Sequence, residues 1–131
     1  MAGDTGVGFE TSVEALLSWN PEYILQIIAV DNNRQYYNQL RNDPIFKDIP
    51  AIAEGRTYTF PVGINYWFTG SEAGLGILIT AKVLHPDKFQ DINVRQEANE
   101  FYKNFLGVEL DDESYEIMLR GFDDAPSLRD L

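Results

Sequence analysis

The sequence predicts an α/β fold, with a small, mainly parallel sheet flanked by helices. Two short runs rich in β-branched and aromatic residues, 23–28 and 57–60, have the composition of buried strands. Segments with the apolar spacing of helices lie before, between and after these runs. Strands joined by helices run parallel, so the order helix, strand, helix, strand, helices indicates a parallel sheet.

The first helix has clear local signals. Thr11-Ser12-Val13-Glu14 fits a capping box, in which the Thr11 hydroxyl and the Glu14 carboxylate satisfy free backbone amides. Asn20-Pro21 is expected to end this helix, because the residue before a proline avoids the helical region. Trp19, which lies just before the first strand, is predicted to be a core residue.

The middle of the chain alternates helix starts with a strand. Residues 31–33 are expected to open a second helix, and Asp43-Pro44 a short third one, with Asp as the N-cap and Pro at the first helical position. The second strand ends at Pro61, and the loop 64–70 that follows is unusually aromatic for a connection.

Three helices are predicted after this loop. Ser71 to about Leu84 is apolar nearly all round, so this helix is expected to be largely buried. A clear amphipathic helix covers 93–106, with Gly107 as its C-terminal cap, and a last helix covers 111–120. The apolar stripe of the amphipathic helix consists of Val94, Ala98, Phe101, Tyr102 and Phe105. Two strands make a poor sheet, so the sequence predicts an incomplete unit.

The charge balance excludes some classes of partner. The chain has 131 residues, with 10 Lys plus Arg against 21 Asp plus Glu, a formal net charge of −11. Nucleic acids and anionic membrane surfaces would repel such a chain. It has no cysteine, which excludes disulfides, thiolate metal sites and cysteine nucleophiles.

The expected organisation is one folded unit with two tails. Residues 1–10 are expected to be a flexible N-terminal segment, 11–122 an α/β lobe, and 123–131 an acidic tail. The first four residues lack the basic start and apolar core of a signal peptide. The apolar stretch 73–84 is too short to span a bilayer, so the chain as given is expected to stay where it is made.

Several motifs follow one another in a fixed order along the chain. A helix, an Asn-Pro, an acidic residue and a buried strand come first, followed by a short helix and a strand. A stretch with a leucine, an alanine-lysine pair, a proline and a phenylalanine comes next, and a helical segment is last. These pieces are Ser12 to Ile24, Asp43 to Phe46, Ile49 to Tyr58, Leu78 to Phe89 and Glu100 to Gly107. Their order resembles the substrate-binding proteins of ABC importers for iron complexes and corrinoids, the class III periplasmic binding proteins.

The resemblance covers about residues 9–120 and implies a C-terminal lobe, or part of one. It implies non-covalent capture of an iron complex or corrinoid, such as a siderophore, heme or cobalamin, and delivery to an ABC permease. It also implies an extracytoplasmic location for the parent protein. Family members are about twice as long and hold the ligand between two lobes, so an excised domain or truncated reading frame is expected here.

Four residues are predicted to bind ligand. In a parallel sheet the carboxyl ends of the strands share one edge, and ligands bind beyond that edge. The loops after the two strands bring Asn32, Asn65, Tyr66 and Trp67 to that edge. Aromatic faces suit a flat ligand and amides suit its polar rim. The alternative is that the aromatic residues plug the end of the core.

The resemblance also suggests a docking residue. In the family an exposed glutamate on each lobe docks on arginines of the permease, and Glu72 is the candidate here. The alternative for Glu72 is a structural role at the start of a helix, where a carboxylate favours the dipole.

Two other readings of the chain stay open. Without the other lobe and one strand, a free sheet edge and apolar surface favour a self-associating fragment, a homodimer that does not bind ligand. A small acid/base hydrolase would use acidic pairs such as those at Asp111 and Asp123, although helix capping and an acidic tail also explain them. His85 is the single histidine, which is poor evidence for a metal site, and no cofactor is expected.

Overall fold

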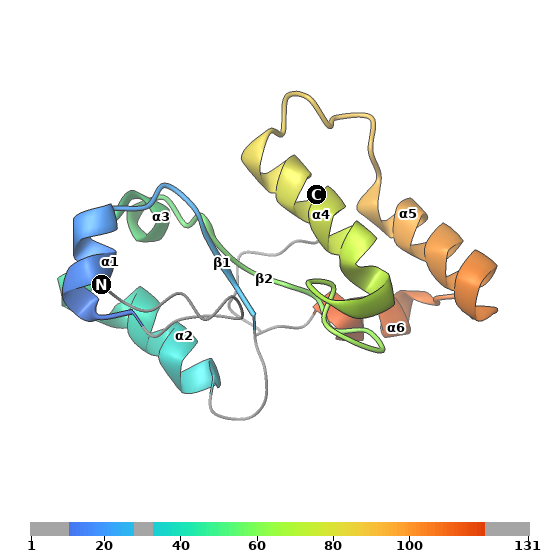
Figure 1. Ribbon diagram of the computed structural model, residues 1–131, viewed down its shortest axis with the longest axis horizontal. Helices are drawn as coiled ribbons and strands as arrows, with labels where there is room; N and C mark the ends of the chain where they lie inside the picture. Colours follow the sequence, from blue (N-terminus) through green and yellow to red (C-terminus); the bar gives the residue numbers. More distant parts are fainter. Residues whose placement is uncertain (1–10, 28–32, 120–131) are drawn as a thin grey trace.

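The computed structural model describes residues 11–27 and 33–119, and its elements follow the predicted order (Figure 1). The helices are α1 Val13–Trp19, α2 Asn33–Asn42, α3 Pro50–Ala53, α4 Ala73–Leu84, α5 Val94–Phe101 and α6 Asp112–Leu119, and the strands are β1 Ile24–Gln26 and β2 Thr57–Thr59. Short 3₁₀ turns, η1 Pro44–Phe46 and η2 Gly70–Glu72, precede α3 and α4, and a π-helical turn, η3 Tyr102–Leu106, continues α5.

The two strands form a parallel sheet, which confirms the predicted fold class. Ile24 lies opposite Thr57, Leu25 opposite Tyr58, and Gln26 opposite Thr59. Both strands are shorter than the runs 23–28 and 57–60 that predicted them. In Figure 1 the strands cross the middle of the molecule, with α1, α2 and α3 at one end and α4, α5 and α6 at the other.

Two apolar clusters lie on the two sides of this sheet. One consists of Phe46, Ile49 and Ala51, and Ile24 packs against it. The larger one is built on Trp67 and on residues of α4, α5 and α6, and Leu25 packs against it. Neighbouring residues of a strand point to opposite faces, so Ile24 and Leu25 each anchor a different cluster to the sheet.

The caps agree in part with the sequence signals. The Asp43 side chain accepts a hydrogen bond from the Ile45 N–H at 3.0 Å, and Gly107 ends η3 with a φ of 67°, both as predicted. The first helix is capped by Ser12, whose hydroxyl accepts from the Ala15 N–H at 3.2 Å, one residue later than the Thr11 cap that was predicted. Trp19 is 55% exposed, so the prediction that it lies in the core is wrong.

The helices after β2 bury one side each. On α4 the residues Leu75, Gly76, Ile79 and Val83 are buried, whereas Ile77 is 71% exposed, so this helix is less buried than its composition predicted. Along the stripe of α5 and η3, Phe105 is also exposed. A π-helical turn has more residues per turn than an α-helix, which moves Phe105 off the buried side.

Some sequence predictions concern the ends of the chain. The predicted segment 1–10 and acidic tail 123–131 lie outside the described residues, as does Asn32. Within the part that is described, no helix has the length and apolar character needed to cross a membrane.

Candidate functional site

The loop that joins β2 to α4, residues 60–72, carries most of the predicted site. It folds back on itself through backbone bonds: the Gly63 N–H donates to the Asn65 carbonyl at 2.9 Å, and Val62 and Tyr66 form an isolated antiparallel bridge. The Trp67 N–H then donates to the Pro61 carbonyl at 3.1 Å. These bonds make residues 62–66 a tight turn at the carboxyl end of β2.

A buried carboxylate holds this turn from behind. Glu72 is fully buried, and its two carboxylate oxygens accept hydrogen bonds from the backbone N–H groups of Ile64, at 3.0 Å, and Asn65, at 2.6 Å. The Tyr102 hydroxyl donates a third bond to the same carboxylate. A buried charge is costly unless its hydrogen bonds are made, and here they are.

The network continues into the core. The Trp67 indole N–H donates to the Tyr102 hydroxyl at 3.4 Å, and both rings are buried. Burial, followed by the bond to the Glu72 carboxylate, raises the pKa of Tyr102 well above its ordinary value. Tyr102 therefore keeps its proton and acts as a donor to Glu72 at neutral pH.

Two glycines allow these contacts. A Cβ on Gly63 would collide with the Tyr102 hydroxyl and with the Glu72 carboxylate. A Cβ on Gly76 would collide with the Trp67 carbonyl and lie 2.7 Å from its carbon, so the loop backbone rests directly on α4. Sequence reasoning identified neither glycine as part of the site.

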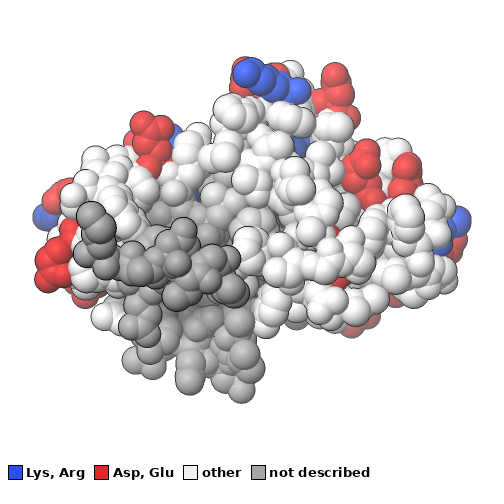
Figure 2. Space-filling model, in the orientation of Figure 1, with Lys and Arg blue, Asp and Glu red and all other residues white. Residues whose placement is uncertain are grey.

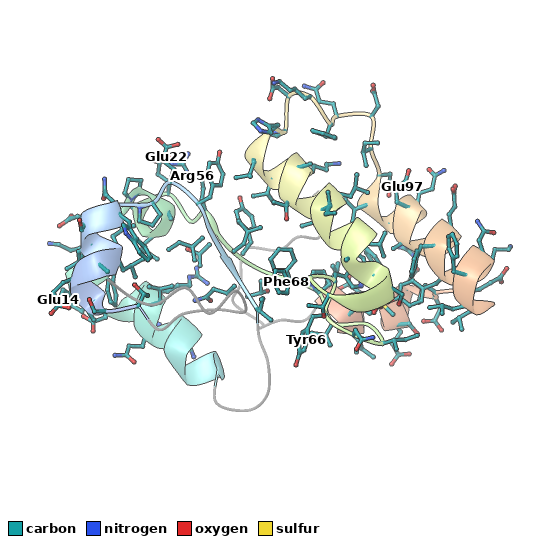
Figure 3. The ribbon with its side chains drawn as sticks, viewed as in Figure 1. Glu14, Glu22, Arg56, Tyr66, Phe68 and Glu97 are labelled. Atoms are coloured by element: carbon teal, nitrogen blue, oxygen red, sulfur yellow. The ribbon has the colours of Figure 1, made fainter. Side chains whose placement is uncertain are left out.

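The predicted ligand-binding residues lie in different environments. Asn65 is exposed and Tyr66 is half-buried, and Figure 3 shows Tyr66 and Phe68 on different sides of the loop. Trp67 is fully buried, so the structure fits the alternative in which it plugs the core. Asn32 lies outside the described residues, so its approach to the other three stays a prediction.

Glu72 also needs a correction. Docking on a permease requires an exposed side chain, whereas this side chain has no exposed surface and its carboxylate is occupied by Ile64, Asn65 and Tyr102. Glu72 does stand at the start of α4, but its side chain makes no capping bond to that helix. Its contacts are with the turn.

An apolar groove of about 590 Å³ lies beside the same loop, between the sheet and α4. It is lined by Leu25, Phe60, Trp67, Phe68, Ala73, Gly76, Ile77, Thr80 and Ala81. Thr80 donates its hydroxyl to the Gly76 carbonyl at 2.8 Å, so this polar wall residue is already satisfied. In Figure 2 the charged side chains gather toward the margins of the face shown, and its middle is mostly free of charge.

Sequence reasoning missed Tyr102 and the groove residues. Tyr102 was read as one member of an apolar stripe, although a buried tyrosine usually needs a partner for its hydroxyl. That requirement, together with an acidic residue before an apolar helix, is a signal that could have suggested the contact between Tyr102 and Glu72. Phe68 lies in the loop 64–70 that was singled out as aromatic, but nothing in the sequence indicated its contact with Phe60, whose ring centroid lies 5.8 Å away.

The two acidic pairs of the hydrolase alternative lie only in part within the described residues. Asp111 is exposed and accepts a hydrogen bond from the Ser114 N–H at 2.7 Å, which caps α6. Asp123 lies outside the described residues. Among residues 11–27 and 33–119, no group of three or more histidine, aspartate or glutamate side chains could hold a metal ion.

Comparison with known proteins gives the class to which this fold corresponds. The chain is a partial homologue of the periplasmic solute-binding proteins of ABC transporters. It superposes on a periplasmic solute-binding protein from Veillonella parvula with a TM-score of 0.71 and 24% identity, over 88% of this chain and 36% of that one. It superposes on an ABC transporter solute-binding protein from Sulfurospirillum deleyianum with a TM-score of 0.70 and 21% identity, over 83% of this chain and 33% of that one.

One relative is similar in both sequence and structure. The chain is 32% identical over 108 residues to the molybdate-binding protein MolA of Haemophilus influenzae, a match that covers 80% of this chain and 30% of MolA. It superposes on the structure of MolA bound to molybdate with a TM-score of 0.63 and 28% identity, over 79% of this chain and 32% of that one. No protein-family model matches the sequence. The chain thus spans about a third of the length of the relatives it matches.

Proposed function

We propose that this chain is part of a solute-binding protein that captures a small oxyanion of the molybdate class for an ABC importer. The observation that carries the proposal is the 32% identity over 108 residues to a molybdate-binding protein. The proposal places the parent protein outside the cytoplasm and gives it an ABC permease as partner. Its chemistry is non-covalent capture, without a catalytic step.

The ligand contacts that we propose are the side chains of Asn65 and Tyr66. A carboxamide offers two N–H donors and a phenol one O–H donor, which suit an oxyanion. Residues 57–81 contain no Lys or Arg, so the donors that this loop itself would offer to an anion are neutral. Asn32 remains a third candidate from the sequence, and Trp67 is assigned to the core.

An iron complex or corrinoid is the second ligand class. Phe68 is 52% exposed and borders the apolar groove, while Tyr66 offers part of a second ring on the same loop. Exposed aromatic faces stack on flat conjugated ligands. This reading shares the loop with the oxyanion proposal and differs in ligand size and in the use of Phe68.

The test is a nuclear magnetic resonance titration of the ¹⁵N-labelled chain. Molybdate is expected to shift the backbone and side-chain signals of Asn65 and the backbone signal of Tyr66, in a saturable way. Sulfate, which is also a tetrahedral dianion, is the control for a non-selective anion effect. Cobalamin and heme complete the panel.

Two variants locate the effect. Asn65→Ala is expected to weaken the molybdate shifts, whereas Asn104→Ala, which changes an exposed asparagine on η3, should leave them unchanged. Equal shifts with sulfate, or no shift with molybdate, would remove the oxyanion proposal. Saturable shifts with cobalamin or heme alone would replace it by the second ligand class.

Self-association is a different candidate function, and an observation favours it. The groove is bordered by Phe68 and by Ile77, which are 52% and 71% exposed, and the sheet has only two strands in the described part of the chain. Contiguous exposed apolar surface of this kind often marks a protein–protein contact. A second copy of the chain would cover this surface.

A further inference from the structure

The position of Glu72 bears on how the loop 60–72 keeps its shape. Glu72 is fully buried, and its carboxylate contacts Tyr102, a large buried side chain of the main core. Its carboxylate contacts two segments that are distant in sequence, the turn at Ile64 and Asn65 and the hydroxyl of Tyr102 at the start of η3. The carboxylate therefore ties the turn to the core across 30 residues of sequence, the separation of Glu72 and Tyr102.

The direction of the Glu72 side chain distinguishes a role in supporting α4 from a role in holding the 62–66 turn. A glutamate that only supported its own helix would bond to the first N–H groups of that helix. Glu72 makes no such bond to α4, and both of its oxygens are directed to the amides of Ile64 and Asn65. Its hydrogen bonds act on the turn, which the side chain reaches back to from the helix start.

The two amide bonds also decide what the turn presents to a ligand. The N–H groups of Ile64 and Asn65 are used by Glu72, so they are not available as ligand donors. The backbone N–H of Asn65 is directed to the buried Glu72 carboxylate, while the residue as a whole is exposed to solvent. Gly63 leaves the space that the Glu72 carboxylate and the Tyr102 hydroxyl fill.

We propose that Glu72 is a positioning residue for ligand binding: its buried carboxylate, supported by Tyr102, fixes the 62–66 turn so that the side chains of Asn65 and Tyr66 face the ligand. The inference rests on the proposed function for its ligand, and on the hydrogen bonds of Glu72 for its mechanism. Glu72 itself does not touch the ligand.

The variant that tests it is Glu72→Gln. A carboxamide has nearly the same shape, but one of its two acceptor oxygens is replaced by an N–H₂ group, which faces a backbone donor. Losing a charged acceptor from a buried network is expected to accelerate amide hydrogen exchange at Ile64 and Asn65 by about tenfold or more. Amides in the second half of α4, such as those of Ile79 and Val83, should keep their exchange rates.

The ligand readout uses molybdate itself. Glu72→Gln is expected to weaken molybdate binding by about tenfold, because the side chains of Asn65 and Tyr66 are no longer held in place. The matched control is Glu97→Gln, an exposed glutamate on α5, labelled in Figure 3, which should leave both exchange and affinity unchanged. Tyr102→Phe is the second variant: it keeps both amide bonds and removes the third, so it should accelerate exchange at Ile64 and Asn65 less than Glu72→Gln does.

Each outcome decides the inference. Faster exchange at the turn together with weaker molybdate binding supports it. Faster exchange with unchanged affinity overturns the positioning role, and unchanged exchange in both variants overturns the claim that Glu72 holds the turn. If the unmodified chain binds no molybdate, the proposed function falls, while the exchange rates of Ile64 and Asn65 still decide separately whether Glu72 fixes the turn.

Discussion

Two glycines of α4 make a sharp test of the packing between the loop 60–72 and that helix. Gly74 and Gly76 lie in the same helix, two residues apart. A Cβ at Gly74 meets nothing within 4 Å, whereas a Cβ at Gly76 would lie 2.7 Å from the carbonyl carbon of Trp67 and closer still to its oxygen. The neighbour of Gly76 is backbone, which cannot rotate away.

The magnitudes follow from these two environments. Replacing glycine by alanine inside a helix stabilises it by up to about 1 kcal/mol when space is free. Gly74→Ala is therefore expected to raise the free energy of unfolding by that amount. Overpacking costs about 1–3 kcal/mol, and a backbone collision belongs at the upper end, so Gly76→Ala should lower the free energy of unfolding by a net of about 2 kcal/mol.

Urea unfolding followed by far-ultraviolet circular dichroism measures both variants. The expected difference between them is about 3 kcal/mol, with unchanged dependence on urea concentration if both variants unfold in the same cooperative transition. If the Gly76→Ala variant proved as stable as the Gly74→Ala variant, the close contact between the Trp67 backbone and α4 would be refuted. The placement of the loop on the helix, and with it the position of Asn65 and Tyr66, would then be wrong.

Two further predictions concern the core network and the groove. The pKa of Tyr102 is raised above its ordinary value of 10.0, so the stability that its proton contributes is complete below pH 10.0 and is lost as the pH rises toward the pKa of the folded state. In urea unfolding, the free energy of unfolding of Tyr102→Phe should therefore fall less steeply above pH 10.0 than that of the unchanged chain. An equal fall in both would contradict the raised pKa of Tyr102. The exposed apolar groove predicts a dimer at micromolar concentration, which light scattering distinguishes from the 14.9 kDa monomer. Ile77→Asp should shift the measured mass toward that of the monomer. A sharp monomer mass for the unchanged chain would rule self-association out.

The sequence predicted the elements that depend on near neighbours. Asp43 caps the turn that it precedes, and Gly107 ends η3, because each signal acts within a few residues. The parallel pairing of β1 and β2 was also predicted, since helices separate the two strands along the chain. The fold class and the likeness to part of the solute-binding proteins both rest on such local features in their right order.

The burial of Glu72 and Trp67, which the sequence did not predict, depends in part on distant partners. Glu72 reads as a surface residue at a helix start, whereas its carboxylate accepts hydrogen bonds from Ile64 and Asn65 and from Tyr102, 30 residues later, inside the core. Trp67 reads as a loop aromatic residue, and its burial follows from packing with α4 and α5. Neither partner can be chosen from one sequence, because many side chains have the same local pattern.

The charge of the chain does not exclude an anionic ligand at this loop. The net charge is −11, but Glu72 is the single charged residue in the sequence between 57 and 81. Its carboxylate accepts hydrogen bonds from Ile64, Asn65 and Tyr102, so three donors balance this negative charge inside the core. The exposed residues of the turn are neutral, the apolar Val62 and Ile64 and the amide-bearing Asn65, and hydrogen bonds from neutral donors are less sensitive to ionic strength than charge pairs are. An oxyanion would be selected there by shape and donor placement, which is the property that a carboxylate fixing the turn from behind provides.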